Sequence, residues 1–285
     1  VFRTITDNSA RVVALTNGEV DIIDGIDANV VDQITAAGCV LNKVEGMNIN
    51  YMAYNTDVLT DPEVRKALSQ AINVPELVES LYRGYASEAT TILPSFVPGY
   101  SSDVHQVSYD PEAAQATLAE KGVTDIYMVA YTNPRPYNTA TGQTLAEAIQ
   151  GYWAKVGVNC RIDTFDWTSY IDKCNTGDFD VCLFGWTGDN GDPDNFLNLL
   201  ANEDIGINVA HYKNDEYNAM LAEAVSLPNG DERNALYGEM EQKLADECVW
   251  LPISHQESLS AYVSNVHNFI YHPTGNVYLS KTYKY

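Results

Sequence analysis

Three apolar, strand-like runs alternate with two helical segments in the middle of the chain, and this pattern constrains the fold most. In order, the segments are Asp125–Tyr131, Gly142–Val156, Val158–Thr164, Trp167–Cys174 and Asp180–Phe184. A β-α-β-α-β order builds a parallel sheet through right-handed crossovers. In open parallel sheets, ligands bind beyond the carboxyl ends of the strands. The pattern therefore predicts an α/β fold with a ligand crevice at one sheet edge.

Shorter segments on both sides of this region predict further alternating elements. Before it, we expect helices at Ser9–Thr16 and Ala28–Ala37 and strands at Val1–Thr6, Val20–Ile23, Val40–Val44 and Asn48–Tyr54. Asp61-Pro62 and Asp110-Pro111 each predict a helix start, because Asp caps a helix and Pro fits its first turn. After it, we expect helices at Glu216–Val225 and Asp231–Glu247, then strands at Cys248–Ser254, Leu259–Val263, Asn268–Tyr271 and Val277–Leu279.

The charge balance excludes several kinds of partner. With 16 basic and 39 acidic residues, the formal net charge is −23, which argues against nucleic acid or an anionic membrane surface, because both need a basic face. No apolar run approaches the roughly 18 residues of a membrane helix. The five cysteines lack metal-binding spacing and are interpreted as mostly buried thiols.

Two loops at the predicted crevice carry opposite charges. Arg135 follows the first strand of the central pattern, and Asp189 lies in the turn-rich segment Gly185–Phe196 after the third. Because neighbouring strands lie about 4.8 Å apart, loops one or two strands apart place the two side chains roughly 5–10 Å from each other. That span suits a ligand with an ammonium at one end and a carboxylate at the other, such as a dipeptide. Arg offers a bidentate fork for a carboxylate, and Trp186 places an aromatic ring beside the Asp189 carboxylate. The spacing thus indicates recognition of a zwitterion.

Other interpretations of the same loops stay open at this point. Arg135 and Asp189 could form an ordinary solvated surface pair. Asp192-Pro193 predicts a helix cap, and Asp194 a first-turn acid of that helix. The three acids resemble part of a calcium loop, but the closing Glu of that pattern is missing. A hydrolase using the acidic loop is disfavoured, since no nucleophile or metalloprotease motif is present and the histidines are scattered.

The chain resembles the extracytoplasmic solute-binding proteins of peptide ABC transporters, solute-binding protein family 5. Matching segments occur in order through nearly its whole length: Tyr54-Asn55-Thr56, Asp61–Leu68, Ala71-Ile72-Asn73, Tyr82-Arg83-Gly84, Leu93-Pro94, Tyr109–Ala114, Arg135–Asn138, Ile149-Gln150, Trp153–Val158 and Gly185–Phe196. The resemblance implies a periplasmic-binding-protein-like fold of type II, cluster C. Such proteins enclose their ligand between two lobes and deliver it to a membrane permease.

The resemblance also assigns the candidate site. It implies that Asp189 binds the α-ammonium of a peptide and that Arg135 binds its C-terminal carboxylate, which favours dipeptides. Tyr137, Trp186, Thr187 and Gly188 are expected to line the pocket. It further implies a monomer without enzymatic activity, cofactor or metal, lipid-anchored in the periplasm or on the outer face of the membrane. Relatives that bind haem or a nickel chelate provide the alternative ligands.

The resemblance predicts how the chain divides between lobes. Residues 55–254 are expected to form a complete second lobe with a mixed sheet around a parallel core. Residues 1–54 and 255–285 are expected to form part of the first lobe, so that this chain is the C-terminal portion of a longer protein. The signal segment and the first strands of that lobe are then expected to lie outside the sequence.

Overall fold

The computed structural model describes residues 1–202 and 207–285. Its helices are α1 Asn8–Thr16, η1 Ala28–Val30, α2 Val31–Ala36, α3 Pro62–Gln70, α4 Val74–Tyr82, α5 Pro111–Glu120, α6 Gly142–Lys155, α7 Trp167–Thr176, α8 Asp194–Ala201, α9 Asp215–Ser226 and α10 Asp231–Asp246. Its strands are β1 Ile22–Asp24, β2 Val40–Glu45, β3 Asn48–Tyr54, β4 Ala86–Glu88, β5 Asp125–Tyr131, β6 Asn159–Phe165, β7 Val181–Thr187, β8 Trp250–Tyr262, β9 Val266–His267, β10 Ile270–Tyr271, β11 Val277–Tyr278 and β12 Tyr283–Lys284.

The main sheet is mixed, with strand order β1-β8-β3-β7-β5-β6, and both β2 and β4 also pair with β8. β5 runs parallel to β6 and to β7, whereas β3 is antiparallel to β7 and β8. The predicted parallel core is therefore confirmed in the three strands of the β-α-β-α-β pattern. The carboxyl ends of β5 and β7 place the loops of Arg135 and Asp189 at the same edge of the sheet.

Local helix signals in the sequence are confirmed at the residues that carry them. The Asp61 side chain accepts a hydrogen bond of 2.9 Å from the Glu63 backbone N–H at the start of α3. Asp110 does the same for Ala113 at the start of α5, also at 2.9 Å. In both helices Pro occupies the first turn, where its missing N–H has no intrahelical partner to lose.

Two strand predictions are wrong. Val1–Thr6 forms no strand, because its residues are mostly exposed and no described strand pairs with them. The carbonyl oxygens of Ile5 and Thr6 instead accept hydrogen bonds from the Arg11 guanidinium. The pieces expected at 248–254 and 259–263 belong to one strand, β8, because Gln256 pairs with β4 and Glu257 with β2 across the polar gap.

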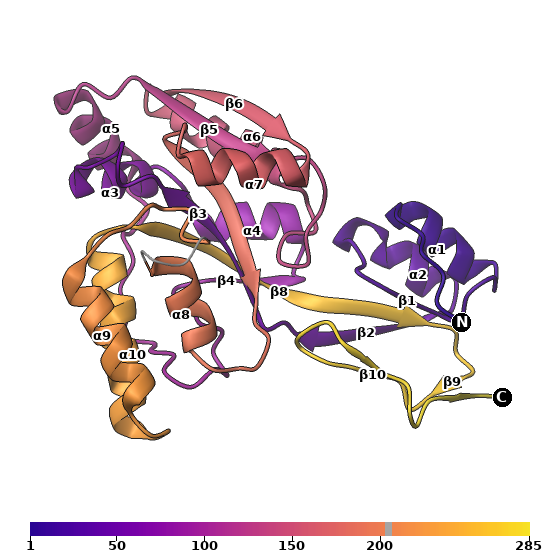
Figure 1. Ribbon diagram of the computed structural model, residues 1–285. Coiled ribbons are helices and arrows are strands. Elements are labelled where there is room, and N and C mark those ends of the chain that lie inside the picture. The colour runs from indigo at the N-terminus through magenta and orange to yellow at the C-terminus, as the bar shows by residue number, and fades with distance from the viewer. Residues whose placement is uncertain (203–206) are drawn as a thin grey trace.

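Buried apolar residues form two separate clusters. The larger cluster covers both faces of the β3-β7-β5 part of the sheet and includes residues of α3, α4, α6, α9 and α10. The smaller cluster consists of Val12, Leu15, Ile23, Ile26, Val31, Ile34, Leu259 and Ala261. Figure 1 shows α1, α2, β1 and β2 together at one end, with β8 running from the larger body into this end. β8 thus belongs to both clusters, with Ile253 in one and Leu259 in the other.

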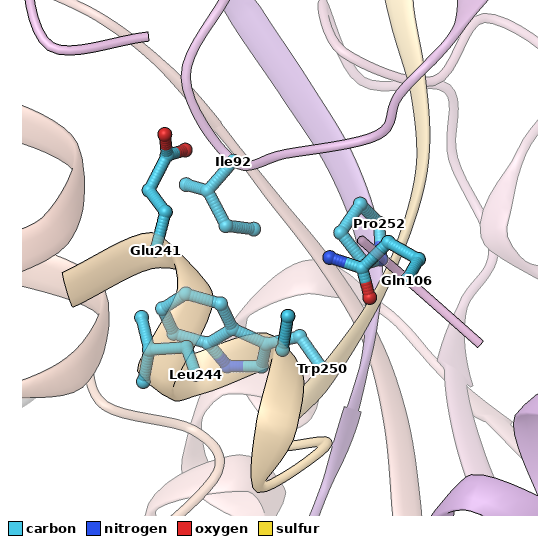
Figure 2. Close-up of a pocket in the computed structure, with 7 residues that line it drawn as sticks. Ile92, Gln106, Glu241, Leu244, Trp250 and Pro252 are labelled. Atoms are coloured by element: carbon cyan, nitrogen blue, oxygen red, sulfur yellow. The ribbon is translucent and has the colours of Figure 1, made fainter. Parts of the chain in front are cut away.

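A small hollow lies in the larger body, and Figure 2 shows the side chains that line it. It is lined by Ile92, Gln106, Glu241, Leu244, Ala245, Trp250 and Pro252. Its volume is about 10 Å³, which is room for a single water molecule and no larger ligand. In the described residues, no helix is both long and apolar enough to cross a membrane.

Candidate ligand-binding cleft

A polar cleft of about 1100 Å³ is large enough for a small ligand. One wall comes from the loops after β5 and β7, at residues 133–136 and 187–189. The opposite wall comes from residues 6–8, Arg11 and residues 24–27 in the smaller end. The lining is completed by Asn48, Thr139, residues 257–259 of β8, Tyr271 and residues 274–276. The cleft therefore lies where the two ends of the molecule face one another.

Asp189 lies on the cleft wall and is exposed. The loop that carries it is held by hydrogen bonds on both sides. The Gly188 backbone N–H donates to the Met47 carbonyl at 2.7 Å, and the Asp189 N–H donates to Asn195 Oδ1 at 2.9 Å. The Asn195 amide also donates to Asp189 Oδ2 at 3.3 Å. The carboxylate is thus fixed in place while remaining open to a ligand.

Arg135 lies on the same wall, and its guanidinium stacks 3.7 Å above the Trp167 ring. The Trp167 ring in turn stacks on Phe184 of β7, with 5.9 Å between centroids. Arg135 and Asn138 exchange backbone hydrogen bonds of 2.9 Å in a tight turn. The buried Asn138 side chain accepts from the Tyr82 hydroxyl and donates to the Tyr131 hydroxyl. Arg135 is therefore presented by a loop that the core fixes.

The other four predicted site residues divide into two pairs. Thr187 and Gly188 line the cleft, and Thr187 Oγ1 has no hydrogen-bond partner among the described residues. Tyr137 and Trp186 do not line it and lie behind the wall. A side chain at Gly188 would meet the Phe196 ring at 2.6 Å, and one at Gly185 would meet Tyr137 at 2.3 Å. Both glycines are needed because these aromatic rings pack directly against the backbone.

Asp192 has a second role that its sequence position does not reveal. Its Oδ1 accepts from the Asp194 N–H at 2.9 Å, as expected of a capping side chain, although α8 begins at Asp194, one residue later than expected. Its two oxygens also pair with the buried Arg233 guanidinium at 2.9 and 3.0 Å. Although partial burial opposes it, this pairing lowers the pKa of Asp192. Asp194 lies in the first turn of α8, as predicted.

The opposite wall was missed by sequence reasoning. Its Arg11 guanidinium is occupied by the carbonyl oxygens of Ile5, Thr6 and Gly25, and Asp7 and Asp27 cap short helices. Asp24 also lines the cleft, and its charge adds to the burial that raises the pKa of Tyr271 to about 12. The capping Asp residues carry a sequence signal for helix starts, but nothing in that signal points to a cleft.

The described residues contain no cluster of three or more His, Cys, Asp or Glu side chains arranged to hold a metal. Asp189, Asp192 and Asp194 have separate contacts, which explains why they do not converge. No histidine lines the cleft in the part of the chain that the structure describes. All five cysteines are free and four of them are buried, so the interpretation as mostly buried thiols is confirmed.

Comparison with known proteins identifies the family. Residues 1–207 match the family model described as bacterial extracellular solute-binding proteins, family 5. Heme-binding protein A of Haemophilus influenzae is 32% identical, with 96% of this chain and 52% of that protein covered. The dipeptide-binding protein of Escherichia coli is 30% identical, with 96% and 53% covered. The chain thus spans about half the length of the curated relatives it matches.

A solved structure supports the same placement. The dipeptide-binding protein of Pseudoalteromonas sp. SM9913, in complex with Met-Leu, superimposes with a TM-score of 0.88 and 25% identity, covering 98% of this chain and 57% of that one. The family match extends over more than half of the chain, and the fold agrees with it. This chain therefore belongs to the bacterial extracellular solute-binding proteins of family 5.

Proposed function

We propose that the protein containing this chain is the substrate-binding component of an ABC importer for dipeptides or other short peptides. The observation that carries this proposal is the presence of Arg135 and Asp189 on the wall of one ligand-sized cleft. Asp189 takes the α-ammonium, and Arg135 holds the C-terminal carboxylate through its guanidinium fork. The relatives named for dipeptide binding support the same ligand class.

The remaining predicted site residues have graded roles in this proposal. Thr187 and Gly188 contact the peptide directly, because both lie on the cleft wall. Trp186 and Tyr137 support the wall from behind, with the Tyr137 ring packed under Gly185. The site recognises a ligand without changing it, so neither catalysis nor a cofactor is part of the proposal.

The proposal is tested by calorimetric titration of the full-length protein with a panel of dipeptides. The tightest binder is then compared with its N-acetylated and C-terminally amidated forms. Asp189→Ala and Arg135→Ala should each weaken binding by about 2–5 kcal/mol, since each leaves one charge of a desolvated pair without its partner. Asp172→Ala, an exposed position on α7 away from the cleft, is the control and should bind as the wild type does. Equal affinity for the acetylated peptide would remove Asp189 from the site.

Haem is the second candidate ligand, favoured by the 32% identity to heme-binding protein A. A haem ligand would not need both charged groups, and no described histidine lines the cleft to serve as an axial ligand. Incubation of the full-length protein with haemin, followed by gel filtration and absorption spectroscopy, separates the two candidates. If a Soret band co-elutes with the protein and no dipeptide of the panel removes it, haem replaces peptides as the proposed ligand.

We further propose that the chain divides between two lobes. The smaller apolar cluster belongs to the first lobe, and exposed aromatic residues of this end, including Tyr278, Tyr283 and Tyr285, suit coverage by the rest of that lobe. β3 packs in the larger cluster, so we place the first crossing near residue 47 instead of 54. The second crossing lies within β8, near residue 255. A monomer that is lipid-anchored outside the cytoplasm and docks on a membrane permease completes the proposal.

A further inference from the structure

We propose that Asn195 is the positioning residue of the ammonium-binding corner, a role that rests on the proposed function. Asn195 lies in the first turn of α8, six residues after Asp189, and does not line the cleft. Its side chain contacts both Asp189 and Trp186 and orients them together. The structure therefore assigns to the Asn195 amide the orientation of two side chains, Asp189 and Trp186, that the sequence predicts at the site.

The Asn195 amide uses both of its ends. Its Oδ1 accepts two hydrogen bonds, from the Asp189 backbone N–H at 2.9 Å and from the Trp186 Nε1–H at 3.1 Å. Its Nδ2 donates to Asp189 Oδ2 at 3.3 Å. One side chain thus fixes the start of the acidic turn, the plane of an indole ring and one carboxylate oxygen. The other Asp189 oxygen is left for the ammonium group.

Helix formation alone does not explain these contacts. The Asn195 backbone N–H already donates to the Asp192 carbonyl at 3.0 Å, and Asp192 Oδ1 already accepts from the Asp194 N–H. The start of α8 therefore has its own partners, and the Asn195 side chain reaches back to the loop before the helix. Its removal leaves the helix start intact but frees the loop.

The physical benefit is pre-organisation. An exposed carboxylate on a loop samples several rotamers, and a ligand must restrict them when it binds. A hydrogen bond to Oδ2 applies that restriction before the ligand arrives. The hydrogen bond to the Trp186 Nε1–H keeps the indole in one orientation behind the cleft wall, where the ring supports the loop that carries Asp189. Both effects act on the amino end of the ligand and leave the Arg135 end unchanged.

The test is a double-mutant cycle in the full-length protein, with the tightest-binding dipeptide of the panel as the probe. Asn195→Ala should weaken binding about 10-fold, in line with the loss of a hydrogen bond to a charged group. In the Asp189→Ala background, the same substitution should weaken binding less than about 2-fold, because its effect acts through Asp189. Equal losses in both backgrounds would show a merely structural role and overturn the proposal.

A second measurement needs no ligand. The Trp186 indole N–H signal in a ¹H–¹⁵N spectrum, assigned by Trp186→Phe, should move and exchange faster with solvent in Asn195→Ala. An unchanged indole signal would overturn the proposal even if no dipeptide binds and the proposed function itself fails. A changed signal would support the positioning role independently of the ligand's identity.

Asn198→Ala is the matched control. Asn198 lies on the same helix, one turn later, and its side chain contacts Asp194 and Asn202, not the loop at 186–189. It should leave both the affinity and the Trp186 indole signal at their wild-type values. The thermal midpoints of Asn195→Ala and Asn198→Ala establish that both variants are folded at the titration temperature. An Asn198→Ala effect equal to that of Asn195→Ala would attribute the loss to α8 as a whole and overturn the proposal.

Discussion

Asp189 in the cleft and Glu241 in the small hollow are two acidic residues held in opposite ways. Asp189 is exposed on the wall of a space of about 1100 Å³, whereas Glu241 is 3% exposed beside a space of about 10 Å³. Glu241 Oε1 accepts from the Leu93 backbone N–H at 3.1 Å, and burial raises the pKa of Glu241 to about 8. In Figure 2, Ile92 lies beside the Glu241 side chain, and Leu244 and Trp250 line the part of the hollow below it.

The comparison shows why a shifted pKa does not by itself mark a ligand site. Perturbed acids concentrate at functional sites, but structural burial produces the same shift. The hollow beside Glu241 has no room for a peptide. The Glu241 carboxyl instead helps to hold α10 against the connection at Thr91–Tyr100. In the cleft, the available volume and the opposite charge of Arg135 carry the functional argument.

The largest effect we expect concerns the pH dependence of stability at Glu241. In the folded protein the pKa of Glu241 is about 8, compared with its ordinary value of 4.5. Between these two pH values, Glu241 is therefore protonated in the native state and ionised in the unfolded chain. Stability from this group is therefore full below about pH 4.5 and is lost as the pH rises toward 8. Between pH 5 and pH 8 the loss amounts to about 3–4 kcal/mol.

Denaturant unfolding of wild type and Glu241→Gln at the two pH values measures this contribution. The variant should lose less stability than the wild type over the same interval, because its amide does not titrate. Glu239→Gln, at an exposed position of the same helix, should retain the wild-type dependence. If Glu241→Gln and wild type show the same pH dependence, burial does not raise the pKa of Glu241.

A smaller effect, on peptide affinity, is expected from removing the stacking of Arg135 on Trp167. Trp167→Leu keeps apolar contact with Phe184 but removes the ring beneath Arg135, which should weaken dipeptide binding by about 0.5–2 kcal/mol. The loss should be smaller for the C-terminally amidated peptide, because only the carboxylate end depends on Arg135. Tyr127→Leu removes a similar stack, with Arg161 at 4.0 Å, outside the cleft and should leave the calorimetric affinity unchanged. An equal loss for both peptide forms would contradict a specific role of the stack.

The smallest effect is expected for an exposed carboxylate outside the cleft. Asp57 pairs with Lys213 at 2.9 Å, and both side chains are more than half exposed. Lys213→Ala should change the free energy of unfolding by less than about 1 kcal/mol and leave peptide affinity unaltered. Thermal unfolding and calorimetry measure the two quantities. A large affinity change here would mean that long-range charge, and not the geometry of the cleft, governs binding.

Much of the local structure could be predicted because its causes are local. Asp61-Pro62 and Asp110-Pro111 determine helix starts through neighbouring backbone groups, and the five central segments alternate with the expected periodicities. That β8 is a single long strand could not be predicted, since polar Gln256 and Glu257 interrupt its apolar pattern. Their pairing with β4 and β2 depends on strands that lie far away in the sequence.

The candidate site divides along the same line. By itself, the sequence determined that Arg135 and Asp189 lie on loops at one edge of a parallel sheet, because a β-α-β-α-β pattern builds parallel strands whose carboxyl ends share that edge. Only the tertiary structure decided that residues 6–11 and 271–276 face them across a cleft, that Asn195 and Trp167 orient the two charges, and that Tyr137 lies behind the wall. The cleft arises from the packing of distant segments along β8, whereas the places of Asn195, Trp167 and Tyr137 depend on side-chain contacts in the larger body. Neither follows from the periodicity of one segment.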